Sequence, residues 1–154
     1  MVKIILLSGE QNHRCCYCSN SMMYHDFNRK GSAPRNAMTR DHVVPKSYGG
    51  CGFYRNIVIA CSQCNGIRGN LHAHVFHRLM EEWKKRDPDF TKTWYYLDRY
   101  ELWRYKMEVL LYQKWHLKSL RRSSPEDGGR YDHFITHHGK YLTAGRNHQV
   151  FHLH

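Results

Sequence analysis

Two short cysteine pairs, far apart in the chain, restrict the folds open to this sequence of 154 residues more than any other feature. Cys15 and Cys18 form one C-x-x-C pair, and Cys61 and Cys64 form the other. A C-x-x-C turn places two sulfurs on one side of a tight knuckle, and two such knuckles complete a tetrahedron around zinc. Because four protein ligands leave no open coordination position, the pairs predict a structural Zn²⁺ whose binding free energy contributes to folding.

Charge and cysteine usage indicate the class of partner and the compartment. The chain has 24 Lys and Arg residues against 13 Asp and Glu residues, and the formal net charge of +11 favours a polyanion as partner. Charge alone does not distinguish such a partner from a plainly basic surface. Six cysteines arranged around two metal-type pairs suit a reducing cytosol better than disulfide bonds. The apolar run at residues 4–7 is too short for a signal peptide, and no stretch is long enough to span a bilayer. We therefore expect a cytoplasmic protein without a membrane partner.

Residues 1–71 are predicted to form a small α+β unit around the metal. The β-branched run at residues 57–60 predicts a strand that leads into the second cysteine pair, and residues 43–44 are expected to end a partner strand. The simplest use for residues 4–7 is a further strand that leads into the first pair. After the last cysteine the sequence predicts a helix that stops at residues 69–70, which are Gly and Asn.

Residues 72–120 are predicted to form a helical extension, because apolar residues recur there at three- and four-residue steps. One stripe consists of Val75, Phe76, Leu79, Met80 and Trp83, and a second consists of Tyr96, Tyr100, Trp103, Met107 and Leu110. Aromatic stripes sometimes stack on nucleic-acid bases, but strict helical spacing favours a core or an interface. The His-rich tail at residues 121–154 shows no ligand spacing, so we expect an ordered or semi-ordered extension there instead of a metal site.

Further residues occur in a fixed order between and directly after the cysteine pairs. They are Asp41-His42-Val43-Val44-Pro45-Lys46-Ser47, Gly49-Gly50, Asn56-Ile57-Val58, and Asn65 directly after the last cysteine. With the four cysteines, this arrangement resembles the HNH endonucleases that carry a four-cysteine zinc, over residues 14–70. Small free-standing proteins of this type are similar to phage and mobile-element nucleases.

The resemblance implies a ββα-metal core and assigns a role to each matching residue. His42 matches the general base that takes a proton from water, and Asp41 matches a ligand of the catalytic divalent ion. Asn56 matches the residue that holds the loop and orients the base. Asn65 stands where the last histidine of the motif is often found, which makes the chain an H-N-N variant, and an asparagine there is a metal ligand in zinc-bearing members that resolve branched DNA.

Elementary chemistry supports the same roles. Phosphodiester hydrolysis needs an activated water and positive charge on the phosphate oxygens. Asp41 and Asn65 offer hard oxygen ligands that suit Mg²⁺ or Mn²⁺. If Asp41 and His42 lie on one strand, their side chains alternate, so the base points away from the ion. The alternative interpretation, a turn aspartate beside a histidine with a structural role, is the common one for an isolated Asp-His pair.

The leading hypothesis is therefore a metal-dependent HNH-type endonuclease that nicks or cuts DNA, most simply double-stranded DNA. Candidate contacts to backbone phosphates are Arg40, Lys46, Arg55 and Arg68, although each alone is more often a plain surface charge. One alternative is a zinc-stabilised DNA- or RNA-binding module without catalysis, and another is a nuclease directed at RNA or at branched junctions. The helical segment offers a surface for a homodimer, which cutting of two strands would require.

Overall fold

The computed structural model describes residues 4–46 and 56–121, with side chains described as far as Lys114. Two of the sequence predictions concern residues outside these ranges, namely Arg55 as a phosphate contact and the tail beyond residue 121. Among the described residues no helix is long and apolar enough to cross a membrane.

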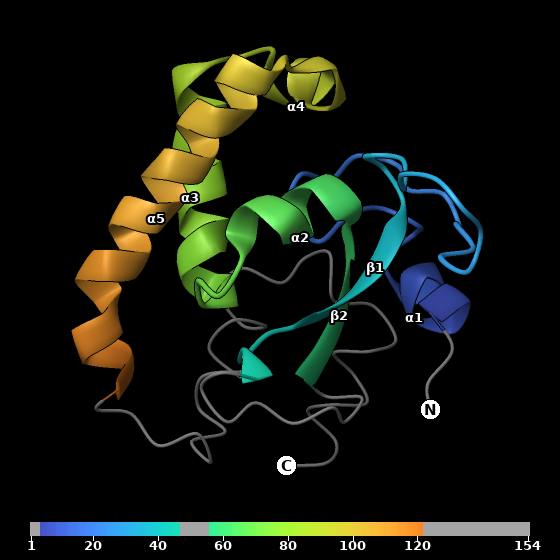
Figure 1. The fold of residues 1–154 in the computed structure, drawn as a ribbon, viewed down its shortest axis with the longest axis horizontal. Helices are drawn as coiled ribbons and strands as arrows, with labels where there is room; N and C mark the ends of the chain where they lie inside the picture. The colour runs from blue at the N-terminus through green and yellow to red at the C-terminus, as the bar shows by residue number, and fades with distance from the viewer. Residues whose placement is uncertain (1–3, 47–55, 122–154) are drawn as a thin grey trace.

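A two-stranded antiparallel sheet lies at the centre of the fold (Figure 1). Strand β1 (Met38–His42) pairs with β2 (Ile57–Cys61), so that Met38 lies opposite Cys61 and His42 lies opposite Ile57. All five residues of β2 are buried, as expected for a β-branched run covered on both faces. The predicted strand at residues 57–60 is confirmed, and the partner strand ends at His42, directly before residues 43–44.

Helix α2 (Ser62–Arg68) follows β2 without a loop. Cys61 caps the helix, because its sulfur accepts a hydrogen bond from the Cys64 backbone N–H at 3.3 Å. Gly69 ends it with φ of 56°, a conformation that glycine adopts without a steric penalty. Two strands and this helix form the ββα unit that the sequence predicts, so the α+β class with a helical extension is confirmed.

The strand predicted for residues 4–7 is wrong, because these residues belong to helix α1 (Ile4–Glu10). A short apolar run does not distinguish a strand from a buried helix segment. Here one side of the helix is buried through Leu7, which is 1% exposed, while Leu6 is 66% exposed. The helix contacts both strands of the sheet.

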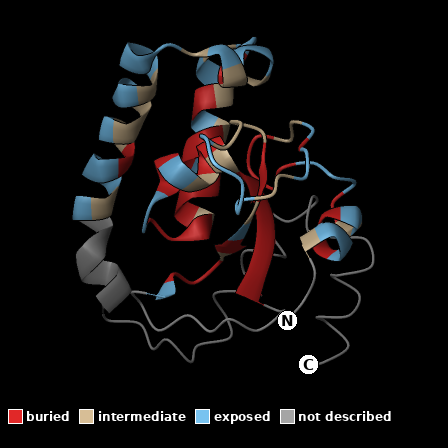
Figure 2. Ribbon diagram, turned by 45° about the vertical axis from the view of Figure 1, so that its right-hand side comes forward, coloured by how far each residue is buried: buried red, intermediate tan, exposed pale blue. Residues whose placement is uncertain are grey.

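The helices after residue 71 pack onto the same hydrophobic core as the sheet (Figure 2). Helix α3 (Ala73–Arg86) buries the first predicted stripe completely, so that prediction is confirmed. The chain then forms α4 (Phe90–Thr93), the 3₁₀ turn η3 (Trp94–Tyr96) and the long helix α5 (Arg99–Arg121). An aromatic cluster joins these elements, and its members are Trp83, Phe90, Trp94 and Tyr105.

The second stripe is not part of the core. Tyr100 and Trp103 are 65% and 57% exposed, whereas Val109, on the opposite face of α5, is fully buried. The helix carries apolar residues on two faces, and the face with Val109 and Tyr105 is the one that meets the aromatic cluster. Periodicity alone could not decide between the two faces, and the interface alternative for the stripe stays a prediction.

Removing Trp83 should cost far more stability than removing a tryptophan on the exposed face. Trp83 is 1% exposed and contacts four aromatic rings, so Trp83→Ala is expected to lower the free energy of unfolding by about 3–5 kcal/mol. The matched control Trp103→Ala, compared at a dilution where the chain is monomeric, should change it by less than about 1 kcal/mol. Chemical denaturation followed by circular dichroism measures both values, and equal losses would contradict the burial of Trp83 in the aromatic cluster.

Candidate active site and metal centre

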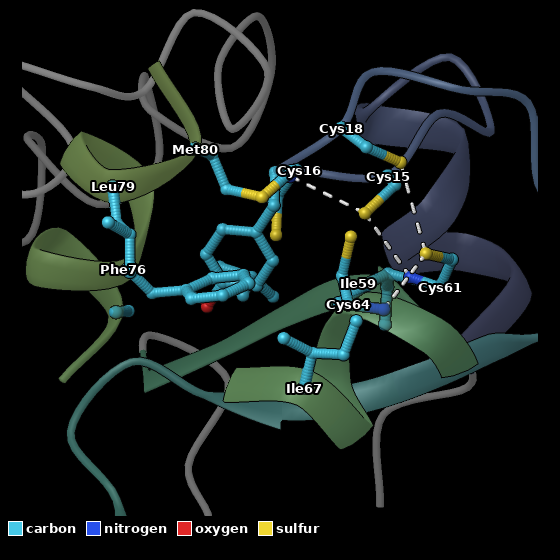
Figure 3. Close-up of a cluster of buried hydrophobic side chains, with 14 of the residues drawn as sticks. Cys15, Cys16, Cys18, Ile59, Cys61, Cys64, Ile67, Phe76, Leu79 and Met80 are labelled. Atoms are coloured by element: carbon cyan, nitrogen blue, oxygen red, sulfur yellow. Dashed lines mark hydrogen bonds between the residues drawn. The ribbon is translucent and has the colours of Figure 1, made fainter. Parts of the chain in front are cut away.

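The four cysteines of the two C-x-x-C pairs come together in a buried cluster (Figure 3). Their sulfurs all lie within 4.8 Å of one another, and all four residues are 0% exposed. The Cys18 and Cys61 sulfurs are 3.9 Å apart. Tetrahedral zinc with Zn–S bonds of about 2.3 Å requires sulfur–sulfur distances of about 3.8 Å, so the cluster fits such an ion. The predicted grouping of these cysteines for metal binding is confirmed.

The pKa shifts of the clustered cysteine thiols also favour a bound metal ion. Burial, followed by hydrogen bonding to Cys15, raises the pKa of the Cys61 and Cys64 thiols well above the ordinary value. Burial opposes ionisation of Cys15 too, but hydrogen bonds from the neighbouring cysteines outweigh it and lower the pKa of that thiol. A cation at the centre supplies the charge that lets buried thiols ionise together. Cys16 is also buried, and burial raises its pKa, so it remains a neutral thiol.

Asp41 of strand β1 forms a buried ion pair with Arg68 of helix α2. Its Oδ1 is paired with the Arg68 guanidinium, and its Oδ2 accepts a hydrogen bond from the Tyr17 hydroxyl at 2.7 Å. The exposed fractions of Tyr17, Asp41 and Arg68 are 0%, 2% and 3%. Burial raises the pKa of Asp41, although Arg68 and Tyr17 act in the opposite direction. Both carboxylate oxygens therefore already have a protein partner.

This arrangement changes the interpretation of Arg68. The sequence suggested a phosphate contact, but Arg68 is buried on α2, and it also donates to the Leu71 carbonyl at 2.9 Å. The predicted phosphate contact of Arg68 is therefore corrected, because an arginine buried beside a carboxylate cannot reach a ligand at the surface. Sequence reasoning also missed Tyr17, which lies inside the first C-x-x-C pair and has no spacing pattern that marks it as a partner of Asp41. The assignment of Asp41 to an ion stays a prediction.

His42 points away from the ion pair, since side chains alternate along a strand. It is partly exposed, unlike its neighbour Asp41. Burial, and next the positive charge of Lys46, lowers the pKa of His42 below its ordinary value. A lowered pKa keeps the imidazole neutral near pH 7, the form that accepts a proton.

Asn56 holds the segment that follows His42. Its Oδ1 accepts a hydrogen bond from the Val44 N–H at 2.9 Å, and its Nδ2 donates to the Val44 carbonyl at 3.2 Å. Its backbone carbonyl accepts from the Val43 N–H at 2.9 Å. These three bonds fix the backbone directly after the candidate base, which is the contact that the predicted role of Asn56 requires.

Asn65 lies on α2, over the same face of β1 as Asp41. Its Nδ2 donates to Thr39 Oγ1 at 3.0 Å and to the Arg40 carbonyl at 3.3 Å. Within the described part of the chain its Oδ1 forms no hydrogen bond, so this oxygen is the available ligand atom. Arg68 is one helical turn further along, which explains why α2 places both side chains above β1.

Arg40 and Lys46 are exposed, as a contact to a phosphate backbone requires.

A family model described as HNH endonuclease matches residues 15–71, less than half of the chain. That range contains the four cysteines, both strands and α2, so the match to the HNH endonuclease domain covers the whole ββα unit. No curated protein and no solved structure matches the chain.

The buried ion pair yields a test of stability. Arg68→Met removes the cation and leaves an uncompensated buried carboxylate, so we expect a loss of about 3–5 kcal/mol in the free energy of unfolding. Arg86→Met removes one side of a largely exposed pair with Glu108 and should cost less than about 1 kcal/mol.

Adding Asp41→Asn to Arg68→Met should restore part of the loss, because the unpaired charge disappears. Urea denaturation of the three variants and the wild type measures how much stability the second substitution restores. Equal losses for Arg68→Met and Arg86→Met would contradict the buried pair.

Proposed function

We propose that this protein is a metal-dependent endonuclease that hydrolyses DNA phosphodiester bonds, with His42 as general base. The observation that carries the proposal is the position of His42 within an HNH-family domain. It is partly exposed at the end of β1, and Asn56 clamps the backbone that follows it. A histidine with a purely structural role would need neither feature.

The chemistry follows from these positions. Neutral His42 accepts a proton from a water molecule, and the resulting hydroxide attacks the phosphorus atom as the bond to the leaving oxygen breaks. Asn56 keeps the imidazole aimed at that water by fixing residues 43–44. A bound Mg²⁺ or Mn²⁺ would neutralise charge on the phosphate and leaving oxygens.

Asn65 and Asp41 are the residues we assign to that ion. Asn65 offers a carbonyl oxygen, and the Asp41 carboxylate has lone pairs beyond the two that Arg68 and Tyr17 occupy. Both side chains lie on one face of β1, while His42 lies on the other, so the base remains unligated. A neutral imidazole that binds no metal is the form that general-base catalysis requires.

The four cysteines are assigned to a structural Zn²⁺. Their sulfur geometry fits tetrahedral coordination, and the described cysteines form no disulfide that would compete with metal binding. Because this ion links residues near both ends of the HNH domain, its loss should unfold the site instead of only weakening the reaction.

Double-stranded DNA is the proposed substrate. The net charge of +11 and the exposed Arg40 and Lys46 near His42 suit a phosphate backbone. A binding module without catalysis would use the same charge, but it would not need a histidine followed by a backbone segment that Asn56 fixes. A junction- or RNA-directed nuclease would share the whole site, and cleavage of linear, branched and single-stranded substrates separates these alternatives.

The His42 assignment is tested by nicking of supercoiled plasmid with Mg²⁺ or Mn²⁺. His42→Ala should reduce the rate at least about 100-fold, because the base is removed, while folding and bound zinc stay unchanged. The matched control is His25→Ala, another partly exposed histidine, which packs against Phe27 and should leave the rate unchanged. Wild-type cleavage by the His42 variant would refute its role as base.

We also propose that the exposed face of α5 binds a second copy of the chain. This face carries Tyr100, Trp103, Met107, Leu110 and Leu111, each at least 39% exposed. Contiguous apolar side chains on a helix typically mark an interface, and a dimer would bring two active sites to one duplex.

Leu111→Asp places a charge on that face and should convert a dimer to a monomer, as measured by light scattering during size-exclusion chromatography. Tyr24→Asp changes a residue that is equally exposed, at 57%, on another part of the surface, and it should leave the molar mass unchanged. A wild-type protein that is monomeric at high concentration would refute the dimer and would not affect the assignment of His42.

A further inference from the structure

Each sulfur of the cysteine cluster has a hydrogen-bond donor, and two of the sulfurs obtain it from backbone N–H groups. The Cys15 sulfur accepts from the Tyr17 and Cys61 N–H groups at 3.4 Å and 3.3 Å. The Cys61 sulfur accepts from the Cys64 N–H at 3.3 Å. All of these donors lie within the segment that the HNH family model matches.

The other two sulfurs obtain their donors from the helical extension. The Trp94 indole N–H donates to the Cys64 sulfur at 3.2 Å, and the Tyr95 hydroxyl lies 3.6 Å from the Cys18 sulfur. Within the described ranges no backbone N–H donates to either of these sulfurs. The extension, beyond the family match, thus completes the hydrogen bonding of the cluster.

Side chains of the HNH domain fix the segment that contains Trp94 and Tyr95. Arg35 donates to the carbonyls of Tyr95 and Leu97 at 2.9 Å and 2.6 Å. Gln63, one residue before Cys64, donates to the Trp94 carbonyl, and Asn20 donates to the Thr91 carbonyl at 3.0 Å. Trp94 itself is 0% exposed. Hydrogen bonds to the backbone before, at and after Trp94 and Tyr95 therefore hold these two side chains in place.

Four thiolates around a divalent ion leave a net negative charge in a fully buried site. Such a charge is costly to bury, and donors directed at the sulfurs reduce the cost. Hydrogen bonds to metal ligands also withdraw electron density and fix ligand orientation, and removing one typically weakens metal binding by about 10–100-fold.

We propose that Trp94 and Tyr95 are positioning residues of the metal site, which stabilise the Cys64 and Cys18 thiolates and thereby retain the ion. This inference rests on the proposed function only in requiring that the four cysteines hold a metal. It makes the helical extension a contributor to metal affinity and not only a partner in packing.

The test uses the full chain and two conservative variants, Trp94→Phe and Tyr95→Phe, which remove one donor each and keep an aromatic ring. The matched control is Trp83→Phe. Trp83 is equally buried, its ring lies 6.0 Å from that of Trp94, and its indole N–H has no hydrogen-bond partner among the described residues. Competition with a chromogenic chelator measures zinc affinity, and the sulfur-to-cobalt charge-transfer band of the Co²⁺ form reports the electron density on the sulfurs.

Trp94→Phe and Tyr95→Phe should bind zinc about tenfold more weakly than the wild type. Their cobalt bands should move to lower energy, because a sulfur without its donor gives up electron density more easily. Trp83→Phe should keep the wild-type band.

Wild-type affinity and spectrum in both donor variants would overturn the proposal, as would an equal shift in the Trp83 variant. Tyr95→Phe removes only a hydroxyl group and keeps the test valid if the Trp94 variant does not fold. A wild-type chain that binds neither zinc nor cobalt would refute the metal site itself, whereas metal binding without any difference among the variants would refute this inference alone.

Discussion

The convergence of four buried sulfurs is the constraint on which the rest of the structure depends. Two of them precede β1 in the chain, one is the last residue of β2 and one lies in α2, so the cluster lies at the end of the sheet away from His42. Two strands and a short helix bury too little apolar surface to be stable alone. A cation that binds only the folded arrangement would add its binding free energy to folding. The extension adds more through the aromatic cluster around Trp83, which packs against the same core.

A second buried electrostatic group, the Tyr17–Asp41–Arg68 set, sets the geometry of the candidate active site. It connects the first cysteine pair, β1 and α2, and so ties the strand that carries His42 to the helix that carries Asn65. Because partners surround Asp41 on the inner face, β1 cannot slip by one residue without exposing the ion pair and burying His42. The same bonds that stabilise the core therefore define which face of β1 presents the base.

Local patterns in the sequence were enough to predict the ββα unit, the cysteine grouping and the first helix of the extension, since each depends on spacing over a few residues. The partners of Asp41 could not be predicted, because Tyr17 and Arg68 contact it only in the folded chain. Neither residue belongs to a sequence pattern that marks it as a partner of a carboxylate. Residues 4–7 were misassigned because four apolar residues fit a strand and a helix turn equally well. The stripe containing Trp103 followed a true helical period, but α5 has a second apolar face with Val109, and tertiary packing chose that one.

The hydrogen-bond donors to the cysteine cluster connect residues 15–71 with the helical extension. A family pattern records the ligands and the residues of the reaction, since their spacing is fixed by chemistry. It does not record how each buried thiolate is stabilised, because many different side chains can donate one hydrogen bond. In this chain Trp94 and Tyr95 provide two such bonds, and Arg35 and Gln63 hold them from the domain side. Lys106 of α5 also donates to the Gly66 and Ile67 carbonyls at 3.0 Å, at the end of α2 where a cation is electrostatically favoured. The helix that carries Cys64 and Asn65 thus has contacts from the extension at both ends, so a change in the extension can alter the position of a candidate ion ligand without touching it.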